Sequence, residues 1–103
     1  MMKNAVNQVA KVTLAIGLLK QLLKEKRILS PRIILFGSYR ENTNRRESDI
    51  DLAIVSTAFT GKDLFERSQM LAGIQWRLTR RLATPFDIVP LTPGEWKNRL
   101  MAS

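Results

Sequence analysis

The chain has 103 residues, of which 45% are hydrophobic and 25% charged, and these values fit one globular domain with one core. It contains neither cysteine nor histidine, which excludes disulfide frameworks, thiolate and imidazole metal sites, and Ser-His or Cys-His nucleophile schemes. Any chemistry must therefore use carboxylates, hydroxyls, basic side chains and backbone groups. The formal charge of +8 indicates an anionic partner such as a nucleotide, a nucleic acid or an acidic protein, with simple solvation of a small domain as the alternative.

The amino-terminal segment is predicted to form one amphipathic helix from about residue 4 to residue 26. Its apolar residues recur at intervals of three and four and form a single stripe of Val9, Val12, Ile16, Leu19 and Leu23. The apolar run from Val12 to Leu19 is far shorter than the roughly 20 residues that span a bilayer. No membrane segment is therefore expected, and the expected location is cytoplasmic.

Two short strands are predicted to follow this helix. Ser30-Pro31 breaks the helix, and the apolar segment Arg32–Phe36 is predicted to be a buried strand that ends at Gly37-Ser38. The polar segment Tyr39–Glu47 fits a loop. Ser48–Val55 is predicted to be the second strand, because its apolar and polar residues alternate.

A second helix is predicted to begin at a capping box that pairs Thr60 with Asp63. One face of this helix is apolar and carries Leu64, Leu71, Ile74, Leu78 and Leu82. Thr84-Pro85 ends the helix, and Phe86–Val89 is predicted to be the third strand. A second capping box, Thr92-Pro93-Gly94-Glu95, opens a short terminal helix. Residues 1–103 are therefore expected to form a single α/β (α+β) domain in the order helix, strand, strand, helix, strand, helix.

Asp49 and Asp51 are the first candidates for a metal site. Residues two apart on a strand project from the same face, so these two carboxylates would stand side by side. A cation between them would remove their mutual repulsion, and ligands that are all oxygen suit Mg²⁺ or Mn²⁺. The alternative is an edge strand with a solvated polar face.

Asp87 is the third candidate ligand, because it interrupts an otherwise apolar strand where an aspartate costs free energy unless it is paired or ligating. If the strand of Asp87 lies beside the strand of Asp51, three carboxylates could hold two metal ions for in-line phosphoryl transfer. The alternative is that Asp87 is a turn residue after Pro85.

Gly37 and Ser38 supply candidate phosphate-binding groups. A glycine at the end of a buried strand lets a phosphate approach the backbone closely, and the following amides and the serine hydroxyl can donate to its oxygens. A Gly-Ser pair alone is weak support for such a site, because most such pairs are turns.

The combined motif resembles the signature of the DNA polymerase beta-like nucleotidyltransferase superfamily. Gly37-Ser38 is followed after ten residues by Asp49-Ile50-Asp51, and the flanking residues are similar to those of the minimal nucleotidyltransferases (MNT) of bacteria and archaea. The resemblance covers roughly residues 32–89. It implies a short mixed sheet flanked by helices, which agrees with the predicted element order.

This resemblance implies a role for each residue of the motif. Gly37 and Ser38 would bind the triphosphate of ATP, and Asp49 and Asp51 would bind two Mg²⁺ ions. Asp87 would bind the catalytic metal and help to deprotonate an acceptor hydroxyl. The chain departs from the family at Arg40-Glu41-Asn42, where many small members have a small residue, an arginine and a glycine. Arg40 is the basic residue expected to bind the nucleotide there.

The reaction implied is the transfer of AMP from ATP to a hydroxyl, with the acceptor on a partner protein. Small members of the family are often encoded beside a helical HEPN-type protein, and some act as the antitoxin of a toxin–antitoxin pair. A different class of function is a binding module with an inactive metal site that caps a helical partner or contacts RNA. Phe65 and Trp76 are candidate interface residues, with coverage by another layer of the same domain slightly preferred.

Overall fold

The computed structural model describes residues 2–36 and 50–102, with side chains described from residue 9 to residue 101 within these ranges. The elements are α1 (Met2–Glu25), β1 (Arg32–Phe36), β2 (Ile50–Val55), the short 3₁₀ helix η1 (Thr57–Phe59), α2 (Leu64–Met70), α3 (Ile74–Leu82), β3 (Phe86–Leu91) and α4 (Pro93–Ala102). The predicted order is confirmed, except that two helices replace the single helix expected between the second and third strands.

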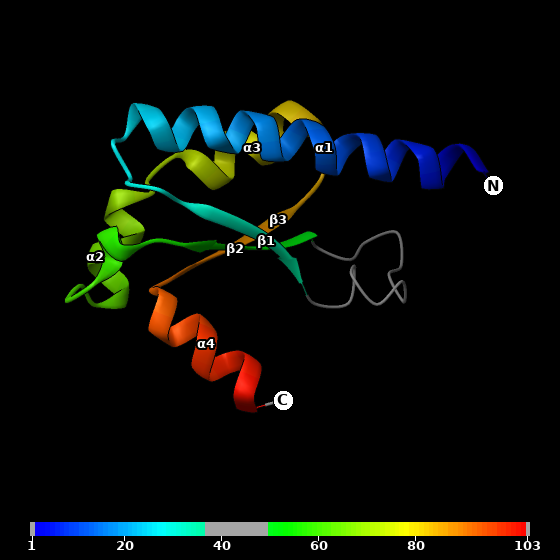
Figure 1. The fold of residues 1–103 in the computed structure, drawn as a ribbon. Helices are drawn as coiled ribbons and strands as arrows, with labels where there is room; N and C mark the ends of the chain where they lie inside the picture. The colour runs from blue at the N-terminus through cyan, green and yellow to red at the C-terminus, as the bar shows by residue number, and fades with distance from the viewer. Residues whose placement is uncertain (1, 37–49, 103) are drawn as a thin grey trace.

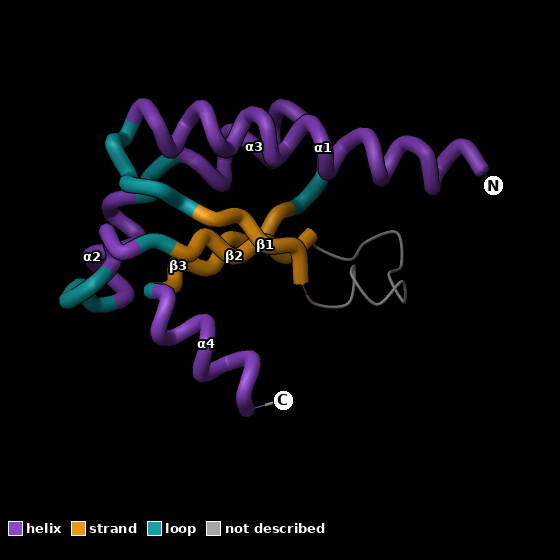
Figure 2. The backbone as a smooth tube through the Cα atoms, in the orientation of Figure 1, coloured by secondary structure: helices purple, strands orange, loops and turns teal. Residues whose placement is uncertain are grey.

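The three strands form one mixed sheet in the order β1-β2-β3 (Figure 2). β1 and β2 are antiparallel, whereas β2 and β3 are parallel and are connected through η1, α2 and α3. β2 is therefore the central strand. The alternative that the segment around Asp51 forms an edge strand is wrong.

The two faces of the sheet are covered by different helices (Figure 1). Leu35, Leu52 and Ile88 are aligned across the strands and face the core, which is completed by residues of α1 and α3 such as Leu19 and Leu78. α4 lies on the opposite side of the sheet. Because side chains alternate along a strand, the residues before and after each core-facing residue of a strand point toward the α4 face.

α1 packs on the sheet through its carboxyl-terminal half. Leu19, Leu22 and Leu23 are buried, and burial of each such side chain stabilises the fold by about 1.5–3 kcal/mol. Val9 is 64% exposed, so the predicted stripe is wrong at its amino-terminal end. The reason is that the first turns of α1 project beyond the ends of the strands (Figure 1). Within the described ranges, no helix is long and apolar enough to cross a bilayer.

The predicted helix that begins after Thr60 is broken at Gly73. α2 ends at Met70, and Gly73, whose φ of 84° is left-handed, is the N-cap from which α3 starts in a new direction. The capping box is also shifted, because Asp63 caps the helix and pairs with Glu66 in place of the Thr60–Asp63 pair expected. Leu64, which the sequence pattern places on the apolar face, is 69% exposed.

Phe65 and Trp76 lie on different helices and both are exposed, by 71% and 62% respectively. The expectation that another layer of this domain covers the two aromatic side chains is therefore wrong for the described residues.

Candidate active site

Asp51 and Asp87 lie directly opposite each other on neighbouring strands. The parallel register of β2 and β3 pairs their Cα atoms, and strands in a sheet are about 4.8 Å apart. Both carboxylates therefore project from the same face, which is the α4 face. Asp51 is half-buried and Asp87 is exposed. The register brings together two of the three predicted metal ligands.

The alternative that Asp87 is a turn residue after Pro85 is wrong, because Asp87 is the second residue of β3. The prediction that an aspartate at this position costs free energy unless it is paired or ligating is also wrong, because the Asp87 side chain is exposed to solvent. What distinguishes Asp87 is its position beside Asp51. The alternating pattern of the strand could not show this, because it depends on which strands are neighbours and on their register.

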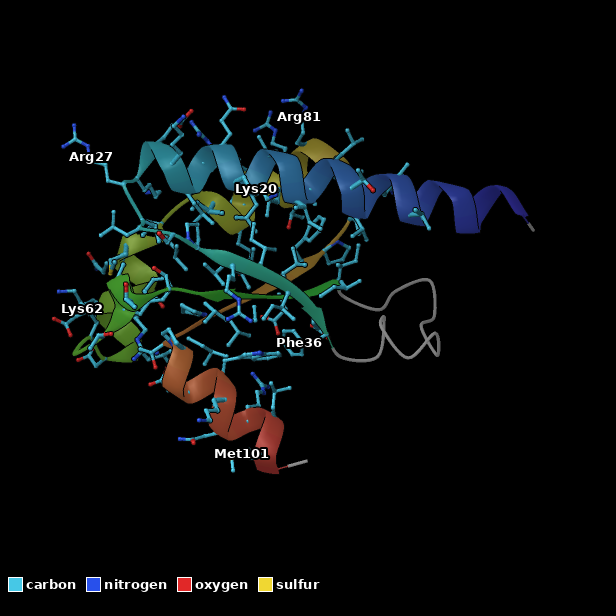
Figure 3. All side chains as sticks on the ribbon, viewed as in Figure 1. Lys20, Arg27, Phe36, Lys62, Arg81 and Met101 are labelled. Carbon is cyan, nitrogen blue, oxygen red and sulfur yellow. The ribbon has the colours of Figure 1, made fainter. Side chains whose placement is uncertain are left out.

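A third residue of the same row marks the end of β1. Phe36 is paired with Asp51, so the row across the sheet runs Phe36, Asp51, Asp87. Phe36 is the last residue of β1 and directly precedes Gly37 in the sequence. Figure 3 shows Phe36 on the α4 side of the sheet. The two carboxylates therefore lie on the same row as Phe36, the strand end that precedes Gly37 in the sequence.

Two α4 side chains that sequence reasoning missed pack against Phe36. The indole of Trp96 meets the Phe36 ring edge to face, with 6.5 Å between centroids and 66° between planes. The Arg99 guanidinium lies over the same ring, 4.9 Å from its centroid. The three-residue spacing of Trp96 and Arg99 places them on one side of a helix. The spacing predicts that Trp96 and Arg99 share one face of the helix. It does not predict which part of the protein that face contacts.

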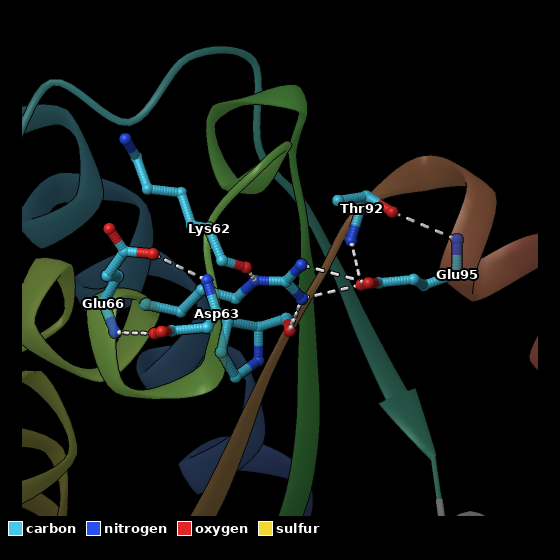
Figure 4. A network of polar contacts seen from close by, with 7 residues as sticks. Lys62, Asp63, Glu66, Thr92 and Glu95 are labelled. Carbon is cyan, nitrogen blue, oxygen red and sulfur yellow. Dashed lines mark hydrogen bonds and ion pairs between the residues drawn. The ribbon is translucent and has the colours of Figure 1, made fainter.

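α4 is held in place by a paired arginine and glutamate at its first turn (Figure 4). Arg67 is buried, and its guanidinium donates to both carboxylate oxygens of Glu95 at 2.7 and 3.0 Å. It also donates to the backbone carbonyls of Lys62 and Pro90. This bidentate geometry fixes both distance and orientation, and it ties α4 to the end of β3 and to the turn before α2.

Glu95 also completes the predicted capping box of α4. The Thr92 amide donates to Glu95 at 2.9 Å, and the Glu95 amide donates to the Thr92 hydroxyl at 3.1 Å, which confirms this box. The hydrogen bonds from Arg67 and from the Thr92 amide lower the pKa of Glu95 from 4.5 to about 2. The hydrogen bond to Glu95 raises the pKa of Arg67. The pair is therefore fully charged at neutral pH.

The donor set fits a hard divalent cation. Asp51 and Asp87 offer carboxylate oxygens from one face of the sheet, and such ligands suit Mg²⁺. Among the described residues, no group of three or more potential metal ligands occurs. The other predicted site residues, Gly37, Ser38, Arg40 and Asp49, lie outside the described ranges.

Comparison with known proteins identifies a family for this chain. No curated protein and no solved structure matches the chain. The model of the family described as "Nucleotidyltransferase domain" matches residues 16–102, a range that contains the sheet, α4 and both described aspartates. The chain belongs to the nucleotidyltransferase domain family.

Proposed function

We propose that this domain transfers AMP from ATP to a hydroxyl of a partner protein in a Mg²⁺-dependent reaction. Membership of the nucleotidyltransferase domain family supports nucleotidyl transfer in general. The observation that carries the proposal is the row of Phe36, Asp51 and Asp87, in which two carboxylates lie next to the strand end that precedes Gly37-Ser38.

The carboxylates are assigned to metal binding and to proton transfer. Asp51 and Asp87, together with Asp49 two residues before Asp51 in the sequence, would hold Mg²⁺. When bound, Mg²⁺ supplies charge neutralisation for the triphosphate and for the attacking oxygen. Asp87 is the exposed member of the described pair, so an acceptor hydroxyl can reach it from solvent.

The remaining residues of the motif are assigned to the nucleotide. Gly37 and Ser38 would donate backbone and hydroxyl hydrogen bonds to the triphosphate, and Arg40 would add a positive charge. Arg99 packs on Phe36 from α4 and is assigned to the nucleotide with them. Guanidinium groups bind phosphate oxygens strongly because their hydrogen bonds are charge-assisted.

The reaction exchanges one phosphorus–oxygen bond for another. The acceptor oxygen forms a bond to the α-phosphorus of ATP, and the bond from that phosphorus to the bridging oxygen of the β-phosphate breaks. Pyrophosphate leaves with the electron pair of the broken bond. The hydroxyl proton passes to the Asp87 carboxylate and from there to water.

The acceptor is assigned to a partner protein, as the resemblance to minimal nucleotidyltransferases implies. By its resemblance to minimal nucleotidyltransferases, we further propose a helical HEPN-type partner and a role as the antitoxin of a toxin–antitoxin pair. The partner then contributes the group that is modified, and the domain contributes the nucleotide and the metal.

The test is the transfer of label from [α-³²P]ATP to a protein that co-purifies with the chain. Transfer is expected to require Mg²⁺. Asp49→Asn combined with Asp51→Asn, and Asp87→Asn alone, should each abolish it. Glu66→Gln on α2 is a matched control, because it removes one exposed carboxylate charge and keeps an acceptor for the Asp63 amide.

Two outcomes of this experiment would overturn the proposal. One is label transfer that persists in the aspartate variants at the level of Glu66→Gln. The other is a partner that co-purifies and remains unlabelled while ATP and Mg²⁺ are present, which would favour a binding module with an inactive site.

A further inference from the structure

A groove runs along the line where α1 and α3 meet, on the side of the molecule away from the candidate active site. Its central hollow of about 330 Å³ continues into hollows of about 370 and 410 Å³, which share lining residues with it. We call this surface the seam groove. Its central part is lined by Leu18, Leu22, Trp76, Arg77, Arg80 and Arg81.

The rim of the seam groove is strongly positive. Arg77, Arg80 and Arg81 come from consecutive turns of α3, and Lys26 extends the rim at one end. The one acidic residue in the lining is Glu25. Its oxygen lies 4.0 Å from Arg77 with both side chains more than half exposed, and such surface pairs contribute little. The groove therefore presents a net positive charge to an occupant.

The floor and the lip of the groove are apolar. Leu18 and Leu22 form the floor, and Leu14 continues the apolar surface along α1 with 60% exposure. Trp76 stands at the lip, with the Arg80 guanidinium 5.1 Å from its ring centroid. Exposed tryptophan and arginine are the residue types that most often dominate binding energy at protein interfaces.

We propose that the seam groove binds an amphipathic helix of a partner protein, with an apolar stripe flanked by aspartates or glutamates. The stripe would pack on Leu18, Leu22 and Trp76, and the flanking carboxylates would pair with the arginines of the rim. α3 has nine residues and is about 13 Å long, so the bound segment spans roughly two to three turns.

The charge of the groove and the residues that line it favour this helix over a second copy of the chain and over single-stranded RNA. A second copy of this chain carries the same +8 charge, and its described helices carry at most one acidic residue each. Single-stranded RNA is bound by several aromatic side chains in series, whereas Trp76 is the one aromatic residue in the lining of the three hollows. An acidic amphipathic helix matches both the rim and the floor.

The seam groove is independent of the proposed catalytic chemistry. α1 and α3 cover one face of the sheet, and Asp51 and Asp87 project from the other. Figure 3 shows Arg81 on the α1 and α3 side and Phe36 on the α4 side. An occupant of the groove therefore leaves the carboxylates open, so that groove variants should lose peptide binding while Mg²⁺-dependent ATP binding is retained.

The experiment uses a fluorescein-labelled peptide of about 15 residues, enough for roughly four helical turns, with a leucine stripe flanked by glutamates. Its affinity is measured by anisotropy at about 150 mM salt, where distant surface charges are screened. The peptide should bind, and a version with lysines in place of glutamates should not. Arg77→Glu/Arg80→Glu/Arg81→Glu, and separately Trp76→Ala, should weaken binding by about tenfold or more.

The matched control reverses three exposed charges outside the groove, Arg27→Glu/Arg32→Glu/Lys62→Glu, and should change affinity by less than about twofold. Circular dichroism checks that each variant is folded. Equal loss in both triple variants would overturn the proposal, because it would indicate attraction by net charge alone. Tighter binding of an RNA of about 12 nucleotides at the same residues, or concentration-dependent self-association abolished by Trp76→Ala, would also overturn it.

Discussion

Asp51 and Asp87 carry like charges on directly paired positions, and two such carboxylates repel each other unless positive charge lies near them. Arg99 brings a guanidinium to the same face through its packing on Phe36. Under the proposed function, a triphosphate bound beside these carboxylates would add more negative charge. The face would then need cations, and Arg99 is a described cation that α4 brings to it.

Arg99→Gln is expected to weaken Mg²⁺-dependent ATP binding about tenfold, the equivalent of about 1.4 kcal/mol for one lost charge-assisted contact. Arg99→Lys keeps the charge and should lose less. Isothermal titration calorimetry measures both. Lys97→Gln is the matched control, because a residue two positions away projects from a different side of the helix. Equal effects at the two positions would contradict a specific role for Arg99.

The site residues differ in how far the sequence predicts them. The spacing of Asp49 and Asp51 after Gly37-Ser38 points to the site without a structure. Predicting that Asp51 lies beside Asp87 requires the strand order and the register, which no local sequence pattern encodes. Predicting the position of Arg99 requires the orientation of α4, and the sequence of this helix has only a weakly apolar face. Long-range packing therefore decides these last two residues.

At the scale of elements, the pair of Arg67 and Glu95 ties the first turn of α4 to α2. Glu95→Gln preserves a side-chain acceptor for the Thr92 amide and so keeps the capping box, but it removes the charge that faces Arg67. We expect this substitution to lower the free energy of unfolding by about 1 kcal/mol, since the Glu95 side chain is 45% exposed and solvent screens the pair. Urea denaturation measures the change.

The same pair makes stability depend on pH. Glu95 has a pKa of about 2 in the folded protein and about 4.5 when unfolded, so its contribution is complete above about pH 4.5. The contribution is lost as the pH falls from 4.5 through 2, because the unfolded chain binds the proton more readily. The difference in stability between the wild type and Glu95→Gln should shrink over this window. A constant difference from pH 6 to pH 2 would contradict the assignment.

Two glycines should respond in opposite ways to alanine. Gly73 has φ of 84°, and an alanine there should destabilise the protein by about 1 kcal/mol or more. Gly17 lies inside α1 with no atom within 4 Å of an added Cβ, so alanine should stabilise the protein by about 0.5–1 kcal/mol. Urea denaturation compares the two. Loss of stability in Gly17→Ala would show that α1 is not a regular helix at this point.

The capping boxes and the helix break show where local patterns suffice. The box of Thr92 and Glu95 is predicted and confirmed, because its residues compete with no neighbouring pair. The box predicted at Thr60 is displaced because Asp63 and Glu66 form a better one three residues later. The break at Gly73 is hidden from the sequence, since Leu71, Ile74 and Leu78 keep helical spacing across it.

At the scale of the whole molecule, the sheet separates two surfaces. The α4 face carries the paired carboxylates, and the opposite face is covered by α1 and α3, whose outer side forms the seam groove. The fold class and the element order follow from the sequence, because alternating and helical periodicities are distinct. The division into two surfaces does not, since it depends on which face of the sheet each helix covers.

The central claim is that the face with Asp51 and Asp87 binds a nucleotide together with a divalent metal. Calorimetric titration of ATP in the presence and absence of Mg²⁺ tests it most directly, on the wild type and on Asp51→Asn/Asp87→Asn. Saturable binding that requires Mg²⁺ is predicted for the wild type. About tenfold weaker binding or more is predicted for the double variant, which should keep a cooperative thermal transition. ATP binding of equal affinity in the two proteins, or no Mg²⁺-dependent binding in the wild type, would contradict the account.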